Sequence, residues 1–218
     1  MFSVSVLKEY PSKAGVYFYT GVAKADGELS FFPRVNQYPD GNIKVSIPAH
    51  VSILSEKIAE QMTTAFIEAV KKHHENPATE PTEEITFGDE KILSSVESHL
   101  TPTIDGSTPT VYENTKYNVH ASITFDFSDS TGEKMLGIDT TLRSRTDGSG
   151  KFIALPSKLG SDGKYYKEVS CSRDLSTLLN QKGLELYNAE LLKNPGNEVK
   201  DVETDTTQKI RKHSAPTR

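Results

Sequence analysis

The segment KFIALPSKLGSDGKYYK, residues 151–167, has the clearest strand pattern in the chain. A short apolar strand at residues 152–155 leads into Pro156, and a polar loop separates it from a second strand that begins at Tyr165. Short apolar runs bounded by turn residues are typical of β-strands. A weaker form of the pattern, an apolar strand that leads into a proline, occurs at residues 42–50. The chain is therefore predicted to contain two copies of one small unit, in which strands are followed by a helix.

Composition limits the class of protein. The chain has 218 residues, which is enough for one or two domains with hydrophobic cores. Its formal net charge is −5, whereas proteins that bind polyanions are usually basic. The single cysteine, Cys171, excludes an internal disulfide and a cysteine-based zinc site, and it is typical of a reducing compartment. Because the N-terminus lacks the signal-peptide pattern and no apolar run is long enough to span a membrane, we predict a cytoplasmic protein with no membrane partner.

The first half is predicted to contain an antiparallel β-meander and one helix. The strands are expected at residues 2–10, 16–24, 29–38 and 43–47. Pro33 predicts an edge or a bulge in the third strand. From residue 52 the apolar positions recur every four residues, which predicts an amphipathic helix capped by Ser52 or Ser55.

The second half is predicted to repeat this order after a linker. Residues 75–90 are acidic and rich in proline and threonine, so a flexible linker is expected there. Residues 92–100 fit either a strand or a short helix. Strands are expected at 118–127 and 135–145, followed by the segment 151–167 and a helix capped by Ser172 or Asp174. Gly183 weakens this helix, Asn194-Pro195-Gly196 ends it, and the polar tail at 197–218 is predicted to be disordered.

The predicted fold class is α+β, with two antiparallel β-meanders that are each followed by an amphipathic helix. The first unit covers residues 1–74 and the second covers residues 91–196. Asp40-Gly41 is matched to Asp147-Gly148, and Pro48 is matched to Pro156. Such a tandem repeat is expected to fold as an intrachain pseudo-dimer whose twofold axis pairs the sheets and covers their edges. Two unrelated α+β domains would share the same turn signals, so this alternative remains open.

The second half, from residue 118 to 191, resembles the SpoVG family (stage V sporulation protein G, also called septation protein SpoVG). The matching positions are Ala121-Ser122-Ile123-Thr124, the segment 152–158 with its Pro-Ser-Lys end, Ser161-Asp162-Gly163-Lys164-Tyr165, Val169-Ser170 and a helix that ends near Tyr187. The first half keeps only the helix and the strand that ends at Pro48. It has Ala49-His50 in place of the Ser-Lys pair.

The resemblance implies both a fold and a function. SpoVG-like proteins are small α+β proteins that dimerise through their sheets and bind DNA and RNA as regulators. This chain would then be a divergent tandem-repeat version, of the kind expected in a phage or a mobile element. The hairpin after the early strand is extended by residues 128–133, which puts the loop contacts of the family in doubt.

Basic residues of the second half cluster around the segment 151–167. The predicted nucleic-acid-binding residues are Arg143, Arg145, Lys151, Lys158, Lys164, Tyr165, Lys167 and Arg173. Arg143 and Arg145 are two apart on one predicted strand, which places them on one face. Rows of cations contact phosphates, and tyrosines such as Tyr165 and Tyr166 stack on bases. An ordinary solvated sheet face would carry similar charges.

Other chemically distinctive residues are given structural interpretations. The aromatic residues of the first half form either a base-stacking platform or, on one face, part of the core or of the pseudo-dimer interface; they are Tyr17, Phe18, Tyr19, Phe31 and Phe32. Alternation along the strand places only Tyr17 and Tyr19 on one face. His73 and His74 point about 100° apart on a helix, so no metal is expected between them. Cys171 is expected to be a small buried hydrophobe and not a nucleophile. The acidic residues near one hairpin are expected to be turn residues and not a cation site; they are Asp126, Asp129, Glu133 and Asp139.

No catalytic motif stands out, so no enzyme activity and no cofactor are predicted. The predicted function is binding of DNA or RNA, either in regulation or as replication-associated single-strand binding, with single strands favoured over duplex. Self-association through sheet edges is a further expectation. The alternative function is a protein-interaction module that uses the aromatic first half or the acidic linker. The basic residues at 209–218 form either an electrostatic tether or a solubilising end.

Overall fold

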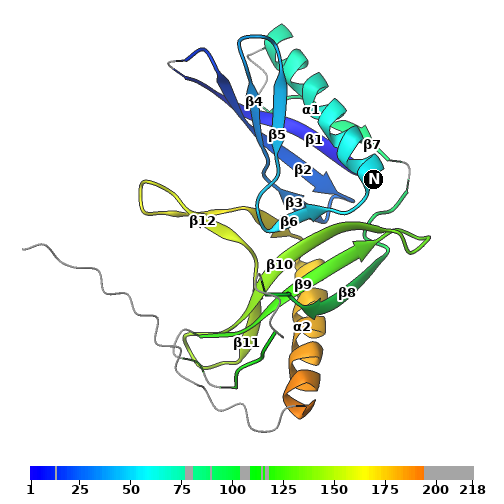
Figure 1. Ribbon diagram of the computed structural model, residues 1–218, viewed down its shortest axis with the longest axis vertical. Coiled ribbons are helices and arrows are strands. Elements are labelled where there is room, and N and C mark those ends of the chain that lie inside the picture. The colour runs from blue at the N-terminus through cyan, green and yellow to red at the C-terminus, as the bar shows by residue number, and fades with distance from the viewer. Residues whose placement is uncertain are drawn as a thin grey trace, which may run out of the picture.

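The computed structural model describes residues 1–12, 14–76, 81–88, 90–103, 109–113, 115 and 118–193, with the backbone alone for 8–11. Over this part of the chain the fold is mixed α+β, with two large antiparallel sheets, two helices and a separate two-stranded arm (Figure 1). Each helix packs on a different sheet. The α+β class predicted from the sequence is therefore confirmed.

The first sheet has seven strands and is built mainly from the first half of the chain. Its strands are β1 (Phe2–Pro11), β2 (Tyr17–Ala25), β3 (Leu29–Phe31), β4 (Arg34–Gln37), β5 (Ile43–Ser46), β7 (Ile85–Phe87) and β14 (Val169–Cys171). β1 and β2 form a long hairpin, and β3 and β4 both pair with the other side of β2. The break between β3 and β4 falls at Pro33, because proline has no N–H to donate to the ladder.

Helix α1 (Glu56–Glu75) covers one face of the first sheet. Its buried residues recur every three or four positions, as expected for an amphipathic helix, and they include Phe66 and Val70. Phe66 lies so close to β2 that a Cβ at Gly21 would be 2.6 Å from its ring. Gly21 therefore faces α1, and Thr20 points to the opposite, open face of the sheet.

The second sheet has five strands, four of them in the order β11-β10-β9-β8. They are β6 (Val51–Ile53), β8 (Ser95–Leu100), β9 (Val119–Ser128), β10 (Lys134–Ser144) and β11 (Lys151–Ala154). Helix α2 (Arg173–Lys193) packs on this sheet. A Cβ at Gly183 would be 2.5 Å from Cδ1 of Ile153, so the glycine that weakens the helix also lets it approach β11 closely.

The two sheets exchange strands. β6 follows the first-sheet strands in the chain but pairs with β10 of the second sheet, with Val51 opposite Ile138. β14 comes from the second half but pairs with β3 of the first sheet, with Val169 opposite Phe31. Each exchanged strand is followed directly by a helix, α1 or α2. Each half of the sequence therefore completes the sheet that is formed mainly by the other half.

Three local features differ from the sequence predictions or extend them. β7 lies within the predicted linker at 75–90, yet it pairs with β1, with Phe87 opposite Phe2. Residues 85–87 thus belong to the first sheet and not to a linker. The segment at 92–100, left open above, contains strand β8. Strand β6 has no counterpart among the predicted strands, because three residues are too few to show a period.

The structure also shows which of the predicted capping residues precedes each helix. Ser55 occupies the position before α1, although its side chain makes no capping hydrogen bond, and Ser52 lies within β6. At α2 the Ser172 hydroxyl accepts a hydrogen bond from the Leu175 N–H at 3.2 Å. Ser172 therefore caps α2.

Strands β12 (Ser157–Leu159) and β13 (Tyr165–Lys167) form the arm, which projects from between the two sheets (Figure 1). The predicted helix stop at residues 194–196 and the tail at 197–218 lie outside the described residues. Among the described helices, none is long and apolar enough to cross a membrane.

Candidate nucleic-acid interface

The arm is an antiparallel ribbon whose six strand residues are all exposed. Lys158 lies opposite Tyr166, and Leu159 lies opposite Tyr165. Because side chains alternate along a strand, Lys158 and Tyr166 share one face, while Tyr165 and Lys167 share the other. The side chain of Tyr165 is 73% exposed, which is high for an aromatic residue. Each face of the arm thus combines a cation with an aromatic ring.

Asp162 organises the tip of the arm. Its carboxylate accepts hydrogen bonds from the Tyr166 hydroxyl at 2.8 Å and from the Lys164 backbone N–H at 3.1 Å. The bond from Tyr166 is the main reason why the pKa of Asp162 lies below its ordinary value. The Tyr166 ring also fits against Gly160, where a Cβ would be 2.6 Å from ring atom Cε2. Tyr166 is therefore used to build the tip, whereas Tyr165 is left available to a ligand.

Two of the three lysines of the arm have no ionic partner among the described residues. Neither Lys158 nor Lys167 forms an ion pair with a described residue. The Lys164 Nζ lies 4.0 Å from Asp162, and its side chain is 78% exposed. Residues 157–167 contain three lysines and one aspartate, so this segment is positive although the whole chain carries −5. Exposed lysines such as Lys158 and Lys167 are suited to phosphate oxygens.

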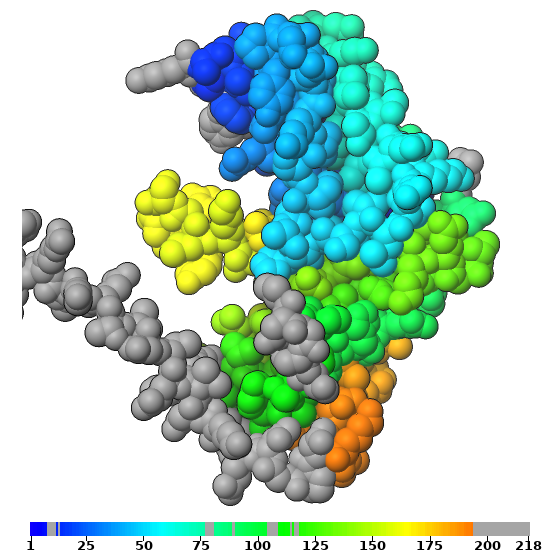
Figure 2. Space-filling model, in the orientation of Figure 1, coloured from blue at the N-terminus to red at the C-terminus, as the bar shows by residue number. Residues whose placement is uncertain are grey.

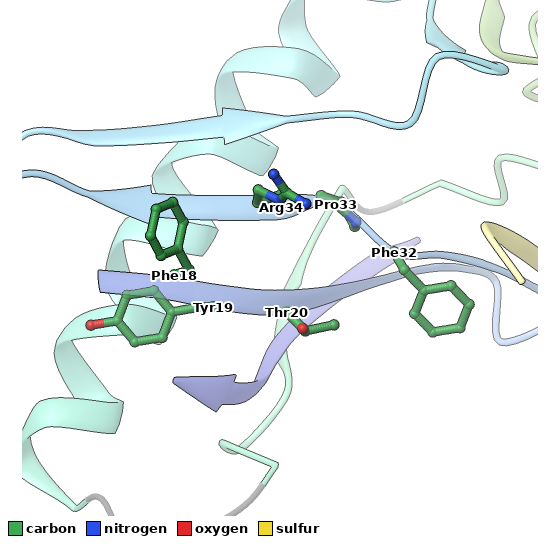
Figure 3. Close-up of a pocket in the computed structure, with 6 residues that line it drawn as sticks. All are labelled: Phe18, Tyr19, Thr20, Phe32, Pro33 and Arg34. Atoms are coloured by element: carbon green, nitrogen blue, oxygen red, sulfur yellow. The ribbon is translucent and has the colours of Figure 1, made fainter. Parts of the chain in front are cut away.

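A hollow of about 540 Å³ lies on the first sheet. It is lined by Phe18, Tyr19, Thr20, Phe32, Pro33 and Arg34 (Figure 3). The backbone N–H of Phe32 donates to the carbonyl oxygen of Glu168 at 3.3 Å, which places the base of the arm beside the hollow. In the space-filling view the arm (yellow) stands apart from the first sheet (blue), with an open space between them (Figure 2).

The predicted binding residues occupy three places in the fold. Lys158, Lys164, Tyr165 and Lys167 lie on the arm. Arg143, Arg145 and Lys151 lie at the opposite end of β11, where β10 ends. Arg173 is the first residue of α2 and follows Ser172, whose N–H donates to Glu28 beside the first sheet. The structure thus brings four of the eight predicted residues together on the arm.

The second group is partly engaged with aromatic rings. The Arg145 guanidinium lies 5.2 Å from the centroid of the Phe152 ring, and the Lys151 Nζ lies 5.2 Å from that of Tyr187. Arg145 also lies beyond the last residue of β10, so the prediction that it shares a strand with Arg143 is wrong. Arg143 and Arg145 are nevertheless both exposed, and they remain accessible to a phosphate.

The hollow itself is not predicted from the sequence, although its residues Phe18, Tyr19 and Phe32 belong to the aromatic run considered as a stacking platform. Tyr19 is 1% exposed and its hydroxyl donates to Gln37 at 2.9 Å, so its interpretation as a core residue is confirmed. Its neighbour Phe18 points to the other face and lines the hollow. The alternation along residues 16–24 was the signal that could have placed Phe18 on the open face, because a helix can cover only one face of the sheet.

The groups considered for metal or nucleophilic chemistry have structural roles. Asp129 holds the β9–β10 turn by accepting a hydrogen bond from the Thr131 N–H at 2.9 Å, and Asp126 pairs with Lys134 at 2.6 Å. In the part of the chain that the structure describes, no three His, Cys, Asp or Glu residues are placed to hold a metal ion. Burial raises the pKa of Cys171 and so disfavours the reactive thiolate.

Comparisons of the chain with protein-family models, with curated proteins and with solved structures gave no match. The geometry of the arm and the hollow is therefore what indicates a function. Together they offer exposed cations, the exposed ring of Tyr165 and partly exposed phenylalanines within one region of the molecule.

Proposed function

We propose that the chain binds nucleic acid, without catalysis, through the arm and the hollow beside it. The observation that carries this proposal is the arm itself. Its Lys158 and Lys167 form no ion pair with a described residue, and Lys167 lies on the same face of the arm as the exposed ring of Tyr165. Lysines contact phosphates and exposed aromatic rings stack on bases. A two-stranded ribbon that is exposed on both faces is marginally stable by itself, so a role in contacting a ligand accounts for it better than a role in the core.

The negative net charge is compatible with this proposal because many of the acidic residues lie away from the arm. Helix α1 carries exposed acids at Glu56, Glu60 and Glu68, on the side of the first sheet opposite to the hollow. Further exposed acids, Glu83 and Glu84, lie in the segment that leads to β7. Local charge and not the total decides where a polyanion binds.

We propose a single strand of DNA or RNA as the ligand, in regulation or in replication-associated binding. Stacking on an exposed ring requires bases that are free of a partner strand, and Tyr165 offers such a ring. A two-stranded β-ribbon also fits the major groove of a B-form duplex, so duplex DNA is the competing ligand. Arg143, Arg145 and Lys151 extend the proposed surface. Lys151 precedes the arm by six residues, which is about 20 Å of extended chain.

A salt titration tests the proposal. Fluorescence anisotropy would follow the binding of labelled single-stranded DNA, single-stranded RNA and duplex DNA to the whole chain between about 50 and 200 mM salt. We expect saturable binding at low salt that weakens steeply as the salt concentration rises, because each phosphate contact releases a counterion. If no labelled oligonucleotide changes its anisotropy at low salt, the proposed function is wrong.

A second candidate function is favoured by the apolar residues of the arm. Leu159 is 54% exposed and lies on the same face as Tyr165, which gives this face an apolar patch that a protein partner would bury. On this account the chain is a protein-interaction module. A partner captured by the chain should then survive nuclease treatment, and its binding should depend on Leu159 and be insensitive to salt.

We also propose that the chain is a tandem repeat that folds as an intrachain pseudo-dimer. The order of elements supports it, since β1 to β6 and α1 correspond one by one to β9 to β14 and α2. This correspondence pairs Pro33 with Pro156 and Asp40 with Asp162, in place of the pairs Pro48 with Pro156 and Asp40 with Asp147 proposed from the sequence. The exchange of β6 and β14 between the sheets resembles that of a fused, strand-swapped dimer, but their partners do not correspond: β14 pairs with β3, the counterpart of β11, whereas β6 pairs with β10, the counterpart of β2.

In this alignment the arm corresponds to the β4–β5 hairpin. In the first half this hairpin pairs along β2 and contacts α1, whereas the arm pairs only within itself. We propose that one copy of the hairpin completes the fold and that the other contacts the ligand. The distant relation to the SpoVG family remains part of the proposal, and it is supported by the Pro156-Ser157-Lys158 segment, which lies at the base of the arm.

A further inference from the structure

We propose that the hollow on the first sheet is a subsite for one unstacked base, so that the chain selects single-stranded over duplex nucleic acid. This inference rests on the proposed function and identifies the residues that would set the preference. Phe18 and Phe32 would supply ring surfaces for the base, and Arg34 would contact the neighbouring phosphate. The lysines of the arm would contact phosphates of any nucleic acid.

The position of Phe18 is set by the alternation of β2. Gly21 faces α1 because Phe66 occupies the space where a side chain would be. Three residues before it, Phe18 must point away from the helix, to the open face of the sheet. Open faces of antiparallel sheets normally carry polar side chains. Phe18 and Phe32 are instead both partly exposed around one hollow, which leaves apolar ring surface without a covering element.

Arg34 adds a positive charge to the same face. It lies opposite Thr20 in the β2–β4 ladder, and residues that lie opposite each other point to the same face. Its side chain is exposed and has no ion pair with a described residue. A guanidinium group matches the geometry of phosphate oxygens and can donate two hydrogen bonds at once. The charge and the rings therefore complement a nucleotide better than they complement an apolar peptide.

Size and access decide which nucleic acid can use the hollow. Its volume of about 540 Å³ lies within the range of roughly 300 to 1,000 Å³ that is usual for sites of small ligands. In a duplex the bases are stacked and paired, so none of them can enter a recess on a sheet. A single strand can turn one base out of its stack and place it against a ring. The hydrogen bond from the Phe32 N–H to Glu168 places the hollow beside the base of the arm. A nucleic-acid strand with one base in the hollow would therefore also pass over the arm lysines.

A pair of leucine substitutions tests the subsite. Phe18→Leu combined with Phe32→Leu keeps apolar side chains at both positions but removes the rings. For a single strand of about 15 nucleotides we expect affinity to fall at least about fivefold, whereas affinity for a duplex of the same sequence should stay within about twofold. Tyr112→Leu is the matched control, because Tyr112 is a partly exposed aromatic residue (37%) in the second half, and it should leave both affinities unchanged.

A second variant keeps the test decisive if the double variant does not fold, as judged by circular dichroism. Arg34→Gln changes an exposed side chain. It should reduce the salt slope of single-strand binding by about 0.7, which corresponds to one phosphate contact, and should leave duplex binding unchanged. Equal losses for single strand and duplex, or no loss for either, would exclude the subsite. If the unmodified chain binds no nucleic acid, both the subsite and the proposed function are wrong. If removal of the arm lysines weakens binding but neither hollow variant does, only the subsite fails.

Discussion

Phe32 of the first sheet donates its backbone N–H to the carbonyl oxygen of Glu168, 3.3 Å away. This bond continues the pairing of β3 with β14, so the base of the arm from the second half is attached to the edge of the hollow in the first half. The candidate interface therefore depends on strand exchange. Neither half of the sequence would build it alone.

The strand exchange predicts that the two sheets unfold together. Val169 of β14 is fully buried against the first sheet, and Val169→Ala should lower stability by about 1.5–3 kcal/mol. Differential scanning calorimetry should show one transition in both proteins, with calorimetric and van't Hoff enthalpies that agree. Two resolved transitions, only one of which shifts in the variant, would mean that the halves are independent domains. Leu178→Ala, at a position 39% exposed on α2, is the control and should have little effect.

The contact between Gly183 and Ile153 predicts a substitution effect of unusual sign. In an exposed helix interior, replacement of glycine by alanine stabilises by about 1 kcal/mol. Here Gly183→Ala should destabilise by about 1–3 kcal/mol, because the new Cβ would meet Cδ1 of Ile153 at 2.5 Å. Urea unfolding measures the change. Adding Ile153→Val should recover part of the loss, and strictly additive effects of the two substitutions would contradict the contact.

The tip of the arm predicts a pH dependence. The pKa of Asp162 lies below its ordinary value of 3.8, mainly because the Tyr166 hydroxyl donates to the carboxylate. The contribution of this bond is therefore present above pH 3.8 and is lost as the pH falls through the lowered pKa. In Tyr166→Phe, an NMR titration should show the pKa of Asp162 moving up toward its ordinary value. An unchanged pKa would show that the hydroxyl is not the cause.

The arm lysines predict a change in salt dependence. Lys158→Ala, Lys164→Ala and Lys167→Ala together should lower affinity for a single strand and reduce the salt slope by about two, because each lost phosphate contact removes about 0.7 from it. A triple alanine variant at Lys57, Lys71 and Lys91 is the matched control, since all three are exposed and none of them lies on the arm or lines the hollow. Equal losses in both triple variants would indicate an effect of net charge and not of the arm.

The second basic group predicts a dependence on the length of the ligand. Arg143→Ala with Arg145→Ala should weaken binding of a strand of about 16 nucleotides more than that of a strand of about 6, because only the longer strand can extend from the arm to the far end of β11. Anisotropy titrations with both lengths measure this. If the two lengths lose affinity equally, these arginines are not a separate part of the surface.

Regular elements were predictable from the sequence where they are long. Helix α1 and the long strands β1, β2, β9 and β10 repeat their pattern over enough residues to show a period. The short strands β6 and β7 show none, and their partners lie in distant parts of the chain. The exchange of β6 and β14 is set by long-range pairing, which a local pattern does not encode.

The candidate site was predictable only in part. Lys158, Lys164, Tyr165 and Lys167 are close in sequence and meet on one hairpin, so their grouping is local. Arg143 and Arg145 were grouped with them because they are near in sequence, but β11 carries the chain away from them before the arm begins. The residues of the hollow come from β2, from the connection between β3 and β4 and from the start of β4, and their proximity to the arm depends on the exchanged strand β14.

The most direct test of the proposed interface is ultraviolet cross-linking of the whole chain to a single-stranded oligonucleotide, followed by mass spectrometry of the cross-linked peptides. Stacked aromatic residues lie within reach of a base, so we predict cross-links at Tyr165 on the arm and at Phe18 or Phe32 in the hollow. A complete lack of cross-links, or cross-links confined to the exposed face of α1, would contradict the account.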